Sequence, residues 1–155
     1  LKGLSPKENR EIPPLRYGLV HQLKHDFPHL TIAVNGGITT DTQIADQLQL
    51  VDGVMVGREA YHNPWVMASW DETFFGAAPN GLTREAVEAQ MCDYMVRQAA
   101  AWGTSWSSVA RHMLGRRNCL PGARKWRQVW SDHRLKALNP HGGMALAHGA
   151  VQAAA

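Results

Sequence analysis

The sequence predicts an α/β fold that continues into an all-helical region. Two short apolar segments, residues 30–34 and 53–56, each run directly into a glycine turn. The stretch between them, residues 39–50, is polar with the apolar spacing of a helix. Strand, helix and strand at this spacing indicate a parallel pair of strands joined by a right-handed crossover. From residue 83 onwards the pattern is helical.

The N-terminal elements are predicted in order from local signals. Residues 1–16 contain three prolines and are expected to form a loop. The spacing of apolar residues predicts a helix over 17–26, which Pro28 ends. Residues 39–41 are all good capping residues, so the helix between the strands is expected to begin there. Pro64 suits the first turn of a further short helix.

Three helices are predicted in the second half of the chain, over residues 83–102, about 105–114 and about 123–135. Thr83 and Gly103 are expected to cap the two ends of the long first helix. One stripe of this helix is expected to face the core. Its members are Val87, Met91, Tyr94 and Met95, with Gln98 as a polar end.

These elements give a domain organisation of four parts. Residues 1–75 form the α/β part, and residues 76–82 form a linker with glycine and proline. Residues 83–138 form a helical domain. The tail, residues 139–155, carries no formal charge and is rich in alanine and glycine, so it is expected to be frayed or disordered.

The composition limits the class of protein. No apolar run approaches the ~20 residues that span a bilayer, so no membrane segment is expected. The histidines lack metal-ligand spacing, which predicts no metal site. Cys92 and Cys119 are expected to be free thiols in a reducing compartment, and the protein to be a cytoplasmic monomer. The chain begins at Leu1 without an initiator methionine, and we expect it to be a fragment.

Positive charge is concentrated in one segment. Residues 106–136 hold eight Lys or Arg against a single acid, while the rest of the chain has an excess of acids. Such a block is typical of a protein with a polyanionic partner. A solvated helix face explains it equally well, and composition alone does not separate the two interpretations.

The glycine turns point to a phosphate. Asn35, Gly36 and Gly37 follow the first strand, and Gly57 and Arg58 follow the second. Glycines let the backbone approach an anion closely, and peptide N–H groups at such turns bind phosphate. Arg58 adds a charge-assisted donor. Ordinary turns between strands and helices also contain glycine, but two in succession, the second with an arginine, favour a ligand site.

The chain resembles the A-type bacterial tRNA-dihydrouridine synthases over residues 1 to about 131. The resemblance rests on five motifs, which are long and specific. They are Leu1-Lys2-Gly3-Leu4-Ser5-Pro6-Lys7-Glu8-Asn9-Arg10-Glu11-Ile12-Pro13-Pro14-Leu15, Asn35-Gly36-Gly37-Ile38, Asp52-Gly53-Val54-Met55-Val56-Gly57-Arg58-Glu59-Ala60-Tyr61, Arg111-His112-Met113-Leu114-Gly115 and Pro121-Gly122-Ala123-Arg124.

The resemblance implies a fold and an activity. The fold is a (β/α)₈ TIM barrel followed by a small helical domain, and the two strands here correspond to the seventh and eighth of the barrel. The family holds FMN, which NADPH reduces, and reduces the C5–C6 bond of a uridine in the tRNA D-loop. A cysteine protonates C5. That cysteine lies before the first residue of this chain, so no catalytic residue is assigned and the chain alone is expected to be inactive.

The resemblance also implies site residues. Asn35, Gly36, Gly37, Gly57 and Arg58 would bind the FMN phosphate, in agreement with the interpretation of the glycine turns. A second set would contact tRNA and consists of Lys7, Arg10, Arg124 and Arg127. The tryptophans at 126 and 130 share one helix face, which favours core packing over base stacking.

Two other functions stay open at the level of the sequence. One is a different FMN- or phosphate-binding barrel oxidoreductase, acting on a small metabolite. The basic helical segment argues against it. The other is a non-catalytic RNA-binding fragment.

Overall fold

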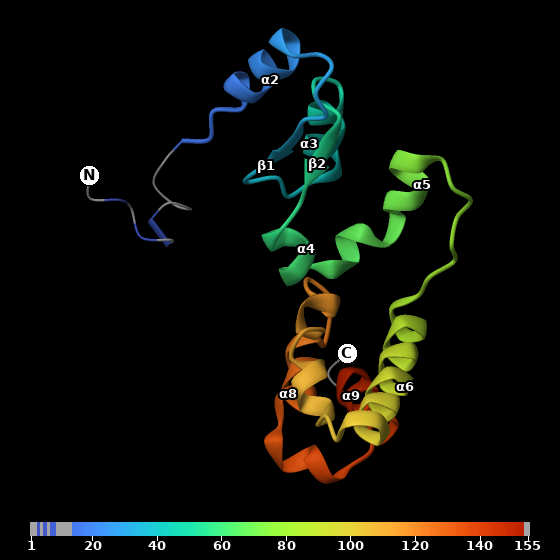
Figure 1. The fold of residues 1–155 in the computed structure, drawn as a ribbon. Helices are drawn as coiled ribbons and strands as arrows, with labels where there is room; N and C mark the ends of the chain where they lie inside the picture. The colour runs from blue at the N-terminus through green and yellow to red at the C-terminus, as the bar shows by residue number, and fades with distance from the viewer. Residues whose placement is uncertain (1–2, 4, 6, 9–13, 154–155) are drawn as a thin grey trace. The chain divides into compact units, whose positions relative to one another are not determined.

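The computed structural model describes residues 3, 5, 7–8 and 14–153 and is shown in Figure 1. The chain divides into two compact units, Leu1–Gly57 and Arg58–Ala155. The division falls at Gly57 and not at the linker expected over residues 76–82. The reason is that helices just after Gly57 pack within the second unit. Residues 76–83 form neither helix nor strand.

The first unit contains helix α2 (Tyr17–Asp26), strand β1 (Ala33–Asn35), helix α3 (Asp41–Leu48) and strand β2 (Gly53–Met55). The strands are parallel, which confirms the predicted crossover unit. Helix α2 has the predicted bounds. Both strands are shorter than predicted.

Local hydrogen bonds fix this unit. The Thr40 hydroxyl accepts from the backbone N–H of Gln43 at 3.2 Å, and the Gln43 side chain accepts from the N–H of Thr40 at 3.2 Å, which is a capping box. Asp52 and Ile32 exchange two bonds just before the strand pair, at 3.0 and 2.8 Å. The register pairs Ala33 with Gly53, so the carboxyl ends of both strands lie at the same edge.

The second unit is helical. Its helices are short except for α6 and α9 (Figure 1). In chain order they are α4 (Arg58–His62), η1 (Pro64–Ser69), α5 (Trp70–Phe75), α6 (Arg84–Trp102), α7 (Trp106–Ala110), η2 (Leu114–Arg117), α8 (Ala123–Ser131), η3 (His133–Ala137) and α9 (Pro140–Gln152).

Helix α6 begins and ends as its sequence predicts. The Thr83 hydroxyl accepts from the N–H of Ala86, and Gly103 ends the helix with a φ of 66°. The buried face of α6 is shifted by about one residue from the predicted stripe. The residues that it buries are Glu88, Cys92 and Met95. Of the stripe expected from the sequence, only Met95 is fully buried.

The carboxylate of Glu88 is completely buried and accepts four hydrogen bonds. Oε1 accepts from the indole N–H groups of Trp126 at 2.7 Å and Trp130 at 2.8 Å. Oε2 accepts from Nη2 of Arg116 and from Nε2 of His148 at 2.8 Å. A buried charge is tolerated only when it is paired and hydrogen-bonded, and this one is both.

Residues 140–152 of the tail form helix α9, so the expectation of a frayed or disordered end is wrong for this stretch. Asn139 caps α9 by accepting from the N–H of Gly142 at 2.8 Å. Gly143 and Ala147 are buried, and Gly143 lies against the ring of Trp130. Small residues, which suggested low burial in the sequence, let this helix approach α8 closely. His148 adds the bond to Glu88.

We expect Glu88→Gln to destabilise the second unit by about 3–5 kcal/mol, because it leaves the guanidinium of Arg116 buried without a counter-charge. Glu85→Gln is the matched control on the same helix. Its side chain is 57% exposed and pairs with Arg117, so the loss is expected to stay below about 1 kcal/mol. Urea unfolding followed by tryptophan fluorescence measures both. Equal losses would contradict the role given to Glu88.

Candidate functional site

The glycine turn after β1 requires glycine at two successive positions. Gly36 has a φ of 131° and Gly37 a φ of 64°, which residues with a Cβ rarely adopt. A Cβ on Gly37 would lie 2.6 Å from Cδ1 of Leu15. The hydroxyl of Tyr17 donates to the carbonyl oxygen of Gly36. The turn is therefore fixed from outside by side chains just before and within α2.

The predicted phosphate-binding residues lie at the carboxyl edge of the sheet, except for Arg58. Asn35 is exposed at the end of β1 and pairs in register with Met55. Gly57 follows two residues later and has open space where a Cβ would be. Arg58 is exposed and is the first residue of α4, in the second unit.

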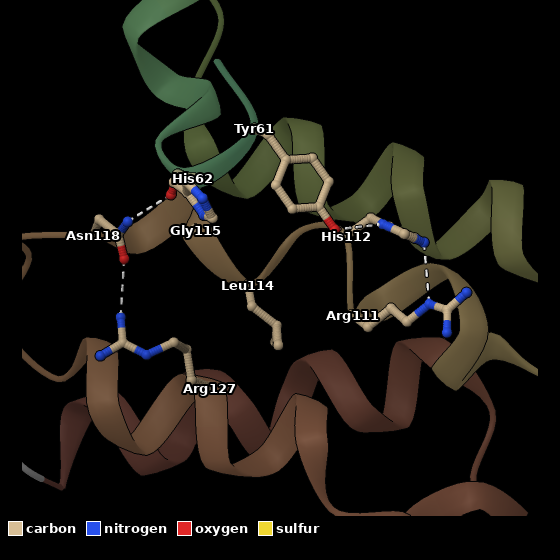
Figure 2. A pocket seen from close by; sticks show the side chains of 8 residues that line it. All are labelled: Tyr61, His62, Arg111, His112, Leu114, Gly115, Asn118 and Arg127. Atoms are coloured by element: carbon tan, nitrogen blue, oxygen red, sulfur yellow. Dashed lines mark hydrogen bonds between the residues drawn. The ribbon is translucent and has the colours of Figure 1, made fainter. Parts of the chain in front are cut away.

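A polar pocket of about 310 Å³ lies in the second unit (Figure 2). It is formed by the end of α4, the segment from α7 to η2, and α8. Two guanidinium groups and two imidazoles line it, and none of its lining residues is acidic. The residues are Tyr61, His62, Arg111, His112, Leu114, Gly115, Asn118 and Arg127.

One side of the pocket is a hydrogen-bonded chain through His112. Nε of Arg111 donates to Nε2 of His112 at 3.1 Å, and Nδ1 of His112 lies 2.8 Å from the hydroxyl of Tyr61. Because an arginine only donates, Nε2 is the acceptor of the imidazole. The neutral ring then carries its proton on Nδ1 and donates to Tyr61.

The other side is built on Asn118. Its Nδ2 donates to the carbonyl oxygen of His62 at 2.6 Å, and its Oδ1 accepts from Nη1 of Arg127 at 3.1 Å. Figure 2 shows this chain from the α4 backbone to the guanidinium. Asn118 therefore orients Arg127, a residue that the sequence assigned to RNA.

Gly115 explains why the pocket can form at all. A Cβ there would lie 1.9 Å from the carbonyl oxygen of His62. The backbones of η2 and α4 meet at this point. The helix predicted over about residues 105–114 would end just before Gly115, but Gly115 lies within η2 and is needed for close approach.

The other residues predicted to bind RNA are less closely gathered. Arg124 is exposed on α8, one turn before Arg127. Lys7 is exposed, and Arg10 lies outside the described residues. Trp126 is 0% and Trp130 2% exposed, which confirms that they are core residues.

The basic segment is less uniform than its composition indicates. Arg116 is buried against Glu88, Arg117 pairs with Glu85 at 3.0 Å, and Arg134 pairs with Asp132 at 2.7 Å. Sequence reasoning missed the pocket residues Tyr61, His62, His112 and Asn118. The motif Arg111-His112-Met113-Leu114-Gly115 was a signal for part of it, because it combined a cation, an imidazole and a glycine.

Neither cysteine belongs to a site, and both are free. Cys92 is fully buried, and its thiol donates to the carbonyl oxygen of Pro140 at 3.5 Å. Burial, followed by the nearby charge of Glu88, raises the pKa of Cys92 to about 11. Cys119 is exposed in a loop with a positive φ of 62°.

The family model described as dihydrouridine synthase (Dus) matches residues 2–145. The chain belongs to the dihydrouridine synthase family. In the part of the chain that the structure describes, no helix is long and apolar enough to cross a membrane.

Individual members of the family are close in sequence. The chain is 51% identical over 140 residues to a protein of Pseudomonas syringae pv. tomato named tRNA-dihydrouridine(20/20a) synthase, over 90% of this chain and 41% of that protein. Proteins of the same name from Escherichia coli K12 and Vibrio cholerae are 50% and 48% identical, over 88% of this chain and 39% and 41% of theirs. This dihydrouridine synthase chain thus spans about two fifths of the length of these relatives.

We expect Gly115→Ala to destabilise the second unit by about 1–3 kcal/mol, because the added methyl group forces η2 away from α4. Gly149→Ala is the control, since it lies in α9 with nothing near its Cβ position. It is expected to be neutral or to stabilise by ~0.5–1 kcal/mol. Thermal unfolding by circular dichroism measures both, and similar effects of the two changes would contradict the close approach.

Proposed function

We propose that this chain is the C-terminal part of a flavin-dependent tRNA-dihydrouridine synthase. The observation that carries the proposal is about 50% identity to proteins of that name, along nearly all of the chain. The acid-free pocket with two arginines supports it, because such a surface suits an RNA partner.

In this proposal β1 and β2 are the seventh and eighth strands of a (β/α)₈ barrel. Barrel active sites lie at the carboxyl ends of the strands, and a phosphate site commonly follows strands 7 and 8. Asn35, Gly36 and Gly37 would bind the FMN phosphate together with Gly57 and Arg58. The positive φ angles of the first two glycines and the shared strand edge fit this role.

Bound FMN, reduced by NADPH, would supply the hydride that reduces the C5–C6 bond of a tRNA uridine. The residues of this chain would bind and orient. Arg127, held by Asn118, and Arg124 on the same helix would contact RNA phosphates, with Lys7 and Arg10 as a second group. The expected cytoplasmic location and monomeric state remain predictions.

We expect the chain to bind tRNA without reducing it. The described sheet has two strands, which cannot close a barrel. Cys92 is sealed in the helical core, and no motif of the family places Cys119 as the acid. Incubation of the purified chain with FMN, NADPH and tRNA should form no dihydrouridine by mass spectrometry of the digested RNA. Turnover would contradict this expectation.

Binding of tRNA by α8 gives a second test. We expect Arg124→Ala to weaken tRNA binding and to lower the slope of log K against log salt by about one, as for the loss of one phosphate contact. Filter binding at several salt concentrations measures this. Arg134→Ala is the control from the same segment, because Asp132 already neutralises that charge.

The two variants are compared in their tRNA affinity, their salt slope and their FMN affinity. Arg134→Ala should change affinity and slope less than Arg124→Ala. FMN affinity should be the same in both variants, because neither residue is among those proposed to bind the cofactor. Equal losses of tRNA and FMN binding would contradict the two separate sites.

A further inference from the structure

Two arginines of the polar pocket carry charge that the chain does not neutralise. Among the described residues, no carboxylate forms an ion pair with Arg111 or Arg127. Each is held by a neutral side chain instead. Nε of Arg111 donates to His112, and Nη1 of Arg127 donates to Asn118. Both guanidinium groups are therefore fixed in place, with their charge and their other N–H groups available to an anion from outside.

These two guanidinium groups lie at different ends of the pocket. Arg111 directly follows α7, and Arg127 lies within α8. Figure 2 shows the two groups apart, with Leu114 between them in this view. The arrangement suits two anions with a spacer between them. Successive phosphates of a nucleic acid strand are arranged in this way, with one nucleoside as the spacer.

The wall of the pocket also carries an exposed aromatic ring. Tyr61 is 55% exposed, although its ring is held on two sides. Its hydroxyl lies 2.8 Å from Nδ1 of His112, and its ring meets those of His62 and His112 at steep angles, with ring centres 5.5 and 5.9 Å apart. A ring that is already fixed loses little conformational freedom when a flat ligand stacks on it.

The size of the pocket fits more than a phosphate. Its volume of about 310 Å³ exceeds what one phosphate group fills and lies at the lower end of pockets that bind whole small molecules. Unpaired bases of RNA commonly stack on tyrosine or histidine rings, whereas paired bases are hidden within their own stack. A ring, two separate cations and this volume together match one unpaired nucleotide.

We propose that the pocket binds one unpaired nucleotide of an RNA strand, with its base stacked on Tyr61 and its flanking phosphates on Arg111 and Arg127. This assignment rests on the proposed function, which supplies RNA as the partner. It adds an aromatic base contact to the phosphate contacts, and it gives Tyr61 and Arg111 a role in binding. Stacking tolerates every base, so the pocket selects unpaired over paired nucleotides and reads no sequence.

Fluorescence anisotropy with the whole 155-residue chain tests this, using two labelled probes of equal length. One is an oligouridylate, whose bases stack little on one another. The other is the same ribose-phosphate chain without bases, so both probes carry the same phosphates. The oligouridylate is expected to bind about tenfold more tightly, as for one base stacked on an aromatic ring. Equal affinity of the two probes would overturn the proposal.

Two substitutions of Tyr61 locate the stacking contact. Tyr61→Leu removes the ring and is expected to weaken oligouridylate binding about tenfold while leaving the abasic probe unchanged. Tyr61→Phe also lacks the hydroxyl but keeps the ring, so it is expected to recover most of the loss. Tyr94→Leu is the control, because Tyr94 is 40% exposed on α6 and does not line this pocket. Equal weakening by the Tyr61→Leu and Tyr94→Leu changes would overturn the proposal.

Two further substitutions locate the phosphates. Arg111→Gln and Arg127→Gln are each expected to lower the slope of log K against log salt by about 0.7 for both probes, as for one phosphate contact on a single strand. Arg97→Gln is the control, because Arg97 is exposed on α6 and does not line the pocket. A change of slope at only one of the two pocket arginines would overturn the arrangement with two phosphates.

The outcome for the pocket can be separated from that for the proposed function. If the chain binds tRNA but does not distinguish oligouridylate from its abasic form, the nucleotide pocket is overturned while the proposed function stands. If the chain binds no RNA at all, both are overturned. Circular dichroism checks the fold of each variant. The comparison of the two probes needs no variant, so a substitution that unfolds the chain still leaves a decisive measurement.

Discussion

The helical unit depends on one buried carboxylate. Glu88 lies on the inner face of α6 and accepts hydrogen bonds from α8, η2 and α9. Its four donors are separated from it by 28 to 60 residues in the chain, so the side chain joins elements that no local signal connects. An ionised carboxylate in an apolar core is stable only with all of these partners in place, and this requirement sets the mutual positions of the three helices and η2.

The position of η2 then determines the polar pocket. Arg116 holds η2 to the core, and the next residues place Asn118 against the carbonyl oxygen of His62. Gly115 lets the backbones meet there. Residues next to Arg116 therefore bond to two different helices. Asn118 accepts from Arg127 on α8, and Arg117 pairs with Glu85 on α6.

The sequence predicted the elements whose signals are local. Helix α2 and the capped start of α3 follow from apolar spacing and from Thr40 with Gln43. Glu88 and α9 were missed because their stability comes from distant partners. A glutamate within a helix usually faces water, and an uncharged run of alanine and glycine has little surface to bury. Here Gly143 packs against the ring of Trp130, and two indole N–H groups donate hydrogen bonds to the carboxylate of Glu88.

The glycine turns were predictable for the same local reason, since glycine is the residue that most readily adopts the positive φ observed at Gly36 and Gly37. The arginines were not, because a count of charges does not separate exposed from buried cations. Arg124 keeps its hydration and suits a long flexible polyanion, whose contacts are many and weak. Arg116 has lost its water and is held by Glu88, so its charge serves the core of the unit. One basic segment thus contains two kinds of arginine, divided by burial: exposed ones that can meet a polyanion and a buried one that holds the core together.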